Sequence, residues 1–494
     1  MKKLITGCFL VLTILLFGQT AKAATSVTVE ETSVTVEPSG DKSGLTDYIA
    51  LRDAIKEYDT INLVDGGQYY LGGKGKGAIN IDDNTTINAT GATIRQMNTG
   101  KGIFKTTSEA ADKAGYSALK NVKIEGGTWI GSTKKCKGYS LFKFFHGQNL
   151  VIENATFKDN YNGHLLEFAG CKDVIVRNCY FGGTYKGEAT NEAVQFDNCT
   201  KGCLQMDSEE QYDNIPCENI LFENNTVVFA RTVGSHHTSG YKGKFMRNIT
   251  IRNNKLTATR DMGLLVYNWY DSKIENNTIS GTSRGVDIVS FFGGAQNHFY
   301  GGYAGAKKNN SKPYNISLKN NTITTKYGPA LRVKGGSVRR ISGVTVENNT
   351  LETKSKSSSI NLIRVEYANQ KKGKGVVIRN NTLKGCYAAY PIYVTNSSYV
   401  TLQKMKYTVK SNKTHNVIQL TDKVSNTTVK NMTIVCNKKN TGNGIYAYNT
   451  TGVKLQSNTI QGAKQYGIHV VKSKKYSISK NKITKSGKKA ILKK

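Results

Sequence analysis

The segment "ISLKNNTI" at residues 316–323 places alternating apolar residues on both sides of a pair of asparagines. The same phrase recurs as "ILFENNTVVF" (220–229), "ITIRNNKL" (249–256), "KIENNTI" (273–279), "VTVENNTL" (344–351) and "VVIRNNTL" (376–383). The second asparagine stands at 225, 254, 277, 321, 349 and 381, at intervals of 29, 23, 44, 28 and 32 residues. Self-similarity at this period indicates a stack of similar structural units.

The residues around each asparagine pair favour short strands, since apolar and polar residues alternate and no helical periodicity lies between the phrases. An asparagine at the same corner of each unit can adopt left-handed backbone geometry and bond to the asparagine one unit away. We therefore predict an all-β protein, a single-stranded right-handed parallel β-helix of about a dozen coils. The longer intervals predict loops inserted into particular coils, notably at 291–313.

The N-terminus has the parts of a secretory signal peptide. Two lysines (2–3) precede an apolar stretch (4–17) and an A-x-A site (21–23). We expect residues 1–23 to be removed and residues 24–44 to form an N-terminal extension. The protein should then be secreted, and it either remains extracellular or associates with the cell wall. No later stretch reaches the ~18–20 apolar residues that span a bilayer, so we expect no membrane span. We also expect the protein to be a monomer.

The chain is strongly basic, with 69 Lys and Arg against 35 Asp and Glu and a net charge of +34. Such a field favours polyanions, so we expect an anionic polysaccharide or cell-wall polymer as partner. A generally solubilising surface is the alternative, and a secreted location argues against nucleic acid. Ten lysines lie between Lys472 and Lys494, where they either solubilise the last coil or anchor the protein to an anionic polymer.

Most of the nine cysteines lie in one third of the chain, where disulfides are an option for an exported protein. There is no paired CxxC motif with zinc-finger spacing, so we do not expect a structural zinc site. The clustered cysteines are Cys136, Cys171, Cys179, Cys199, Cys203 and Cys217.

The segment "LTDYIALRDAIKEYDTINLVDGGQYYL" (45–71) predicts a short helix over 48–57 followed by a strand. Here the chain resembles the pectin-lyase-like superfamily of right-handed β-helix proteins, which includes pectate lyases and polysaccharide epimerases. The resemblance implies that this helix caps the N-terminal end of a coil stack over 45–494. The superfamily contains lyases, hydrolases, epimerases and binding proteins, so its fold does not choose between them.

A second group of strand-like segments lies between the asparagine phrases and can be aligned by its apolar residues. Its members are "LLEFAGC" (165–171), "AVQFDNC" (193–199), "TVGSHH" (232–237), "GLLVYN" (263–268), "GVDIVS" (285–290), "ALRVKG" (330–335), "LIRVEY" (362–367) and "PIYVTN" (391–396). If the coils stack in register, the residues between the aliphatics form two outward columns. The first column reads Glu167, Gln195, Gly234, Leu265, Asp287, Arg332, Arg364 and Tyr393. The second column reads Ala169, Asp197, His236, Tyr267, Val289, Lys334, Glu366 and Thr395.

These columns hold the groups that β-elimination at a uronate requires: a base, an acid and a cation beside the carboxylate. His236 and Tyr267 are candidates for base and acid. The candidate catalytic residues are His236, Tyr267, Asp197, Arg332 and Lys334. The candidate substrate-binding residues are Glu167, Gln195, Asp287, Arg364 and Glu366. Glu167, Asp197 and Asp287 are candidate ligands for Ca²⁺, which prefers oxygen.

The leading functional hypothesis is a secreted polysaccharide lyase acting on a uronate-containing or other anionic glycan. A non-catalytic carbohydrate- or cell-wall-binding protein is the alternative, with a C5-epimerase or a glycoside hydrolase as further options. Outward positions of a β-helix are polar by default, and Asp287 and Arg332 can form a cross-coil salt bridge. "RVK" (332–334) is similar to the "RIK" of polygalacturonases, but the paired aspartates and "GHG" of that family are missing. The "WIDH" and "RxPxxR" phrases of calcium pectate lyases and the "DPH" of alginate epimerases are missing too.

Overall fold

The fold is seen in a computed structural model of the whole chain. The structure describes residues 32–494 apart from 74, 99–101, 107–114, 135–138, 187–190, 201–212, 236–243, 291–312, 337–339, 370–373 and 440. The predicted signal peptide (1–23), His236, Cys136, Cys203 and the predicted inserted loop up to residue 312 lie outside the described residues.

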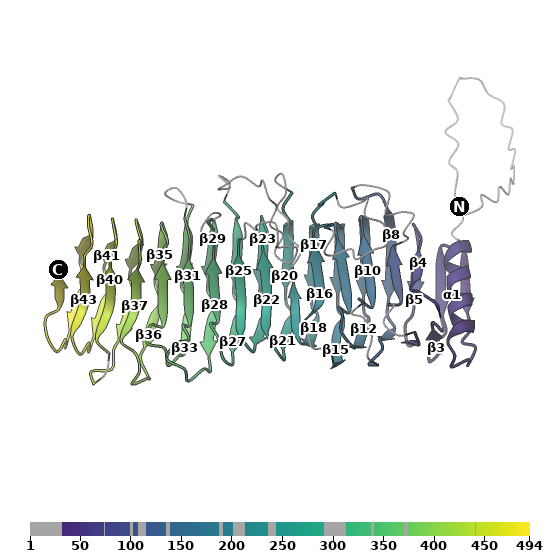
Figure 1. Cartoon of the computed structure of the whole chain (residues 1–494), viewed down its shortest axis with the longest axis horizontal. Coiled ribbons are helices and arrows are strands. Elements are labelled where there is room, and N and C mark those ends of the chain that lie inside the picture. The colour runs from purple at the N-terminus through teal and green to yellow at the C-terminus, as the bar shows by residue number, and fades with distance from the viewer. Residues whose placement is uncertain are drawn as a thin grey trace, which may run out of the picture.

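The chain winds into an elongated stack of coils with three parallel sheets, as predicted (Figure 1). Each coil gives one strand to each sheet, and every strand pairs with the equivalent strand of the next coil. The sheets contain 16, 15 and 15 strands, so the stack is somewhat longer than the dozen or so coils expected.

The first sheet runs along one side of the stack. Its strands, in order, are β1 (Ser33–Val36), β2 (Thr60–Leu63), β5 (Thr86–Asn88), β8 (Leu119–Glu125), β11 (Gly147–Glu153), β14 (Lys172–Arg177), β17 (Glu218–Glu223), β20 (Arg247–Arg252), β23 (Ser272–Glu275), β26 (Ile316–Lys319), β29 (Val344–Glu347), β32 (Val376–Arg379), β35 (Val400–Gln403), β38 (Thr428–Lys430), β41 (Lys454–Gln456) and β44 (Ser477–Ser479).

The second sheet follows the asparagine corner. Its strands are β3 (Gln68–Leu71), β6 (Thr93–Gln96), β9 (Thr128–Ile130), β12 (Thr156–Asn160), β15 (Tyr180–Tyr185), β18 (Thr226–Phe229), β21 (Lys255–Ala258), β24 (Thr278–Gly281), β27 (Thr322–Thr325), β30 (Thr350–Thr353), β33 (Thr382–Gly385), β36 (Lys406–Thr408), β39 (Thr433–Val435), β42 (Thr459–Gln461) and β45 (Lys482–Thr484).

The third sheet carries the predicted site residues. Its strands are β4 (Ile79–Ile81), β7 (Phe104–Thr106), β10 (Phe142–Phe145), β13 (Leu166–Ala169), β16 (Glu192–Asp197), β19 (Arg231–Gly234), β22 (Met262–Tyr267), β25 (Arg284–Val289), β28 (Leu331–Lys334), β31 (Ile363–Glu366), β34 (Ile392–Thr395), β37 (Asn416–Thr421), β40 (Asn443–Tyr448), β43 (Tyr466–Val471) and β46 (Ile491–Lys493).

The two asparagines of each corner have separate roles. The first one bends the chain: Asn320 is exposed and has φ +57°, a left-handed conformation that asparagine tolerates better than most residues. The second one is buried and forms the ladder. Asn321 Nδ2 donates to Asn349 Oδ1 at 2.9 Å, and the backbone N–H of Asn321 donates to the same oxygen at 2.9 Å. The predicted ladder is therefore confirmed, with its bend and its hydrogen bonds on neighbouring residues.

The ladder also bonds backbone groups at the corner. Asn321 Nδ2 donates to the carbonyl oxygen of Ile274 in the preceding coil at 3.0 Å and to that of Lys319 in its own coil at 2.8 Å. Carbonyl oxygens at such a buried corner need donors, because a buried polar group without a partner is costly. The corner sequence therefore satisfies the backbone groups that the turn removes from the sheets.

The interior of the stack is filled by one column of inward side chains from each sheet. In the N-terminal half this core is aromatic: Phe157 stacks on Phe181 at 5.1 Å, and Phe168 stacks on Phe196 at 5.7 Å between ring centroids. In the C-terminal half it is mainly aliphatic, and Ile, Val and Leu side chains there are fully buried. The same position in successive coils thus packs on itself along the stack.

Helix α1 (Leu45–Glu57) covers the N-terminal end of the stack, as expected. It begins three residues earlier than predicted, after Gly44, and the N–H of Thr46 in its first turn donates to Asp41 Oδ2 at 3.3 Å. Asp47 is buried and accepts hydrogen bonds from the N–H groups of Ser39 and Tyr70, both at 2.8 Å, so it ties the helix to the stack. In the part of the chain that the structure describes, no helix has the length and apolar character to cross a membrane.

We predict that Asn321→Ala lowers the free energy of unfolding by about 1–3 kcal/mol, because it leaves buried donors and acceptors without partners. The measurement is urea unfolding followed by circular dichroism. The neighbouring Asn320→Gly is the matched control and should cost less than about 1 kcal/mol, since glycine adopts a positive φ readily. Equal losses in the two variants would contradict the ladder as the stabilising element.

Candidate functional site

The outward face of the third sheet carries every described candidate site residue, and its register agrees with the alignment made from the sequence. Gln195 pairs with Glu167, Asp287 with Leu265, and Arg332 with both Asp287 and Arg364. The second column agrees in the same way from Tyr267 to Val289, Lys334, Glu366 and Thr395. We call these two outward columns the outer strip.

The N-terminal half of the outer strip is not the open face that the sequence predicted. Glu167, Gln195, Asp197, Tyr267 and Asp287 are all at most 4% exposed. Burial makes an unpaired carboxylate very unfavourable, so these acids require nearby partners.

Asp287 is the centre of a buried ionic cluster on β25. Arg332 binds it with two hydrogen bonds, Nε to Oδ1 and Nη2 to Oδ2, both 2.6 Å long. Tyr267 Oη donates to Oδ2 at 3.0 Å, and Arg284 Nε lies 3.2 Å from the same oxygen. Burial, followed by the negative charge of Asp287, raises the pKa of Tyr267 well above its usual value. The cross-coil salt bridge between Asp287 and Arg332 is thus formed.

The other acids of this half are also engaged. Glu167 accepts a hydrogen bond from Ser140 Oγ, and its Oε1 lies 3.2 Å from Lys143 Nζ. Gln195 Nε2 donates to Asp197 Oδ2 within β16. These contacts pair the buried acids with neighbouring polar and basic side chains on the outward face of the third sheet.

The three candidate calcium ligands do not converge on one ion. Glu167 and Asp287 lie on β13 and β25, which are four strands apart in the third sheet. At about 4.8 Å per strand they are separated by roughly 19 Å, whereas Ca²⁺ binds its ligands at about 2.3–2.6 Å. The prediction that Glu167, Asp197 and Asp287 bind one Ca²⁺ ion together is therefore wrong. The fixed spacing between neighbouring coils keeps Glu167 and Asp287 too far apart.

The C-terminal half of the outer strip is more accessible. Lys334, Arg364 and Tyr393 are partly exposed, while Glu366 is 9% exposed. Arg364 Nη2 donates to Glu366 Oε1 at 2.8 Å, and its guanidinium lies 5.4 Å from the ring centre of Tyr393. Burial alone would raise the pKa of Glu366, but Arg364 lowers it below its usual value.

Aromatic residues continue the first column beyond the segments that the sequence analysis aligned. Tyr393 pairs with Gln419, Gln419 with Tyr446, and Tyr446 with His469. The signal was available in "NVIQLT" (416–421), "NGIYAY" (443–448) and "YGIHVV" (466–471), which keep the same alternation of apolar and outward residues. The alignment of strand-like segments in the sequence ends at 391–396, so Gln419, Tyr446 and His469 are not among its candidate residues.

The rings of this segment contact one another. Tyr446 and Tyr448 are stacked with ring centroids 6.4 Å apart and planes 7° apart. His469 lies 5.2 Å from Tyr446 and 4.8 Å from Tyr466. All four side chains are partly exposed. Partial burial raises the pKa of Tyr446 and lowers the pKa of His469, which favours the neutral form of each. We call Tyr393, Gln419, Tyr446, Tyr448, Tyr466 and His469 the aromatic strip.

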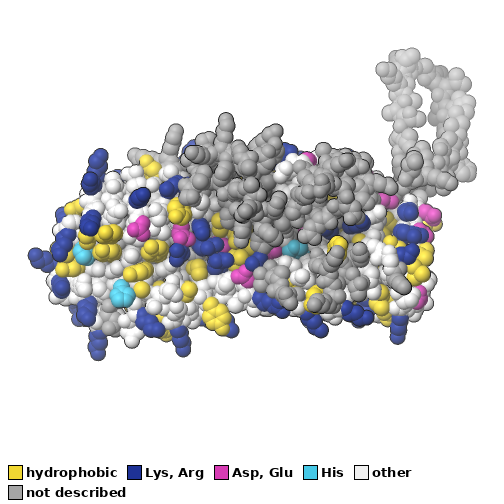
Figure 2. Space-filling view, viewed as in Figure 1, with side chains coloured by type: hydrophobic (Ala, Val, Ile, Leu, Met, Phe, Trp, Pro, Cys, Tyr) yellow, Lys and Arg dark blue, Asp and Glu magenta, His cyan; other side chains and the backbone are white. Residues whose placement is uncertain are grey.

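A shallow pocket of about 290 Å³ lies beside the start of the aromatic strip. It brings the guanidinium of Arg364 and the rings of Tyr390 and Tyr393 together with small polar side chains. The lining residues are Ser358, Ser359, Asn361, Arg364, Ala389, Tyr390 and Tyr393. Figure 2 shows Lys and Arg side chains interspersed with hydrophobic and histidine side chains on the C-terminal half of the visible face.

One group of metal-ligating side chains stands out among the described residues. His146, Cys199 and Asp213 have ligand atoms within 4.8 Å of one another, at a corner between the third and first sheets. The sequence did not predict it. Although "LLEFAGC" (165–171) and "AVQFDNC" (193–199) align in the sequence, Cys199 is not the neighbour of Cys171 in the first sheet. Cys217 takes that place: its Sγ accepts a hydrogen bond from the N–H of Cys171 at 3.4 Å. All six described cysteines are buried, and none of these six is in a disulfide.

Comparison with known proteins agrees with this architecture. Residues 305–483 match the family model described as a right handed beta helix region. The chain is thus a right-handed parallel β-helix protein, and the matched model describes a fold without naming a reaction.

Individual relatives are distant. The curated Plasmin and fibronectin-binding protein A of Streptococcus pneumoniae is 23% identical over 289 residues, which are 52% of this chain and 39% of that protein. The chain therefore spans about two fifths of that relative's length. The structure of the Streptococcus pneumoniae surface protein and adhesin PfbA is 17% identical, covering 93% of this chain and 99% of that chain, with a TM-score of 0.38.

The tailspike protein of E. coli bacteriophage HK620, solved in complex with a pentasaccharide, is 14% identical over 90% of this chain and 76% of that chain. Its TM-score is 0.50. At this level of identity the likeness shows a shared fold.

We predict that Asp287→Ala lowers the free energy of unfolding by about 2–4 kcal/mol, because the partly buried Arg332 and Arg284 would lose their counter-charge and the buried Tyr267 hydroxyl its acceptor. Chemical denaturation measures this loss. The control is Glu218→Ala, which removes an ion pair to an Arg247 side chain that is 51% exposed and should cost less than about 1 kcal/mol. A small effect of Asp287→Ala would contradict a structural role for the buried ionic cluster.

Proposed function

We propose that this chain is a non-catalytic protein of the cell surface that binds an anionic polysaccharide along the aromatic strip. The observation that carries the proposal is the register of Tyr393, Gln419, Tyr446 and His469, which occupy the same outward position in four consecutive coils. This conclusion adopts the alternative of the sequence analysis in place of a lyase.

The geometry of the strip suits an extended glycan. Consecutive rungs repeat at about 4.8 Å, a spacing similar to the length of one sugar unit. Tyrosine and histidine rings offer apolar faces on which sugar rings can stack, while the phenol oxygens remain available for hydrogen bonds. Gln419, between two rings, adds an amide for sugar hydroxyls. The strip therefore supplies repeated, similar contacts along one line.

Charge favours an anionic glycan. Lys472 Nζ lies 5.8 Å from the ring centre of Tyr448, and Lys488 Nζ lies 6.0 Å from that of Tyr466. Cations beside stacking rings can pair with carboxylate or sulfate groups of a bound polymer. Because such contacts are exposed, binding should weaken as salt rises.

The named relatives support a surface role. One is a surface protein and adhesin, and the bacteriophage tailspike was solved with a pentasaccharide. Together with the predicted signal peptide, they support export to the cell surface, where we expect the chain to act as a monomer. The name of the curated relative refers to plasmin and fibronectin, so a protein ligand is the outcome that a binding test must separate from a glycan.

A lyase receives less support from the geometry. Tyr267, a candidate acid, is buried and donates to Asp287. Arg332, the candidate cation, forms an ion pair with the same carboxylate. The candidate base His236 lies outside the described residues. Asp197 is fully buried and bonded to Gln195. Elimination needs these groups at a substrate, and the described contacts hold them together instead.

We predict that Tyr446→Ala weakens binding of the preferred polysaccharide five- to ten-fold, since one stacked ring contributes about 1 kcal/mol. The measurement is glycan-array screening followed by calorimetric titration at two salt concentrations. Tyr327→Ala is the matched control, because Tyr327 is 57% exposed but lies outside the strip. Equal losses in both variants, or binding of fibronectin and plasmin with no polysaccharide bound, would contradict the proposal.

We also predict that the protein releases no unsaturated product from a panel of uronic-acid polymers, with or without added Ca²⁺. Product is followed by its ultraviolet absorbance, and a known pectate lyase serves as the positive control. Turnover that disappears in Tyr267→Phe would establish the lyase hypothesis instead.

A further inference from the structure

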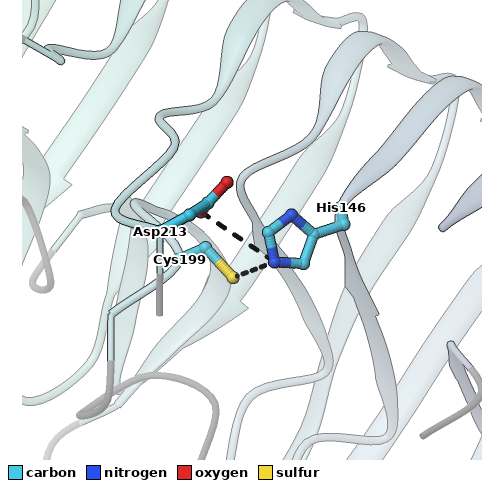
Figure 3. A group of neighbouring side chains, drawn as sticks. All are labelled: His146, Cys199 and Asp213. Carbon is cyan, nitrogen blue, oxygen red and sulfur yellow. Dashed lines mark hydrogen bonds and ion pairs between the residues drawn. The ribbon is translucent and has the colours of Figure 1, made fainter. Parts of the chain in front are cut away.

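Three side chains that are far apart in the sequence meet at one corner of the stack (Figure 3). His146 follows β10, Cys199 follows β16, and Asp213 precedes β17. His146 Nε2 lies 3.0 Å from Cys199 Sγ and 3.9 Å from Asp213 Oδ1. His146 and Cys199 are fully buried, while the Asp213 side chain is 20% exposed.

The imidazole is fixed from its other side. His146 Nδ1 lies 2.6 Å from the carbonyl oxygen of Gly115. A carbonyl can only accept, so Nδ1 carries the hydrogen and Nε2 of the neutral ring presents its lone pair to Cys199 and Asp213. A histidine that ligates a metal is commonly oriented in this way by a backbone carbonyl.

The carboxylate and the thiol are fixed by the same segments. Asp213 Oδ2 accepts the N–H of Gly115 at 3.0 Å, and its Oδ1 accepts the N–H of Ile215 at 2.9 Å. The N–H of Cys199 donates to the carbonyl oxygen of Ile215 at 2.8 Å. Gly115 thus holds His146 and Asp213, while Ile215 holds Asp213 and Cys199. Hydrogen bonds to backbone groups of Gly115 and Ile215 therefore hold the three ligand atoms close together, in addition to the contacts between the side chains themselves.

We propose that His146 Nε2, Cys199 Sγ and Asp213 Oδ1 bind a divalent transition metal, with Zn²⁺ as the ion they fit best. Imidazole nitrogen, thiolate sulfur and carboxylate oxygen are the three ligand types that Zn²⁺ takes in proteins, at about 2.0–2.3 Å. On binding, the Cys199 S–H bond breaks, its proton leaves to solvent and sulfur donates its electron pair to the metal. A water molecule suffices for the fourth position of a tetrahedral site.

The ligand set argues against Ca²⁺ here, because calcium takes six to eight oxygen ligands and has little affinity for thiolate. The burial of His146 and Cys199 argues for a structural ion rather than a catalytic thiol, since a substrate has no access to the sulfur. The ion would fasten the segment before β17 to the coils that contain β10 and β16. This role is independent of the proposed glycan binding.

The test uses the full chain, purified and dialysed against a chelator, then titrated with Zn²⁺ or Co²⁺. We expect one ion per chain by elemental analysis and, with Co²⁺, the near-ultraviolet thiolate-to-cobalt absorption of a cysteine ligand. Cys199→Ser should lose that absorption and bind Zn²⁺ at least ten-fold more weakly. Cys436→Ser is the matched control, a buried free thiol elsewhere in the stack, and should behave as the unchanged protein.

The thermal midpoint provides a second readout. Zn²⁺ should raise the midpoint of the unchanged protein and of Cys436→Ser, because an ion that binds only the folded state stabilises it. If Cys199→Ser does not fold, Asp213→Asn replaces it and should weaken Zn²⁺ binding while keeping the cobalt–thiolate absorption. Metal uptake without a thiolate band, equal uptake by Cys199→Ser, or no bound ion in the unchanged protein would overturn the proposal.

Discussion

The parallel pairing of each strand with the same strand one coil later is the constraint on which the rest of this structure depends. It fixes the distance between equivalent residues at about 4.8 Å and allows no side chain to leave its column. The buried asparagine ladder maintains that pairing at the corners: Asn321, for example, bonds the asparagine of the next coil, a carbonyl of the preceding coil and a carbonyl of its own coil. Among the described residues, the candidate sites are therefore linear arrays along the stack axis or corners where chain segments cross.

That distinction separates the two regions of interest. The aromatic strip is a linear array, because one outward position is filled by rings or an amide in four successive coils. Such an array suits a polymer that repeats along one direction. The cluster of His146, Cys199 and Asp213 is a corner site, where backbone outside the strands turns back and lets three unlike ligands meet.

The buried ionic cluster around Asp287 shows how the same columns can serve the fold instead. Asp287 and Arg332 are adjacent rungs, so a carboxylate and a guanidinium come within hydrogen-bonding distance without any loop to position them. Burial then makes the pair mutually dependent, because either charge alone would be unfavourable there. Acidic and basic residues that lie in register on a β-helix are therefore not enough to indicate a catalytic site, because they can also form structural ion pairs.

The sequence by itself determined the coil stack, its asparagine ladder, the helix that covers its N-terminal end and the register of the outer strip from Glu167 to Tyr393. All of these follow from short-range alternation and a repeated turn, which are visible in a linear chain. Tertiary structure alone decided that Glu167, Asp197 and Asp287 are buried, and that Glu167 and Asp287 are too far apart to share an ion. It also decided that His146 meets Cys199, 53 residues away, because contacts made by loops and corners depend on how coils pack and leave no periodic trace in the sequence.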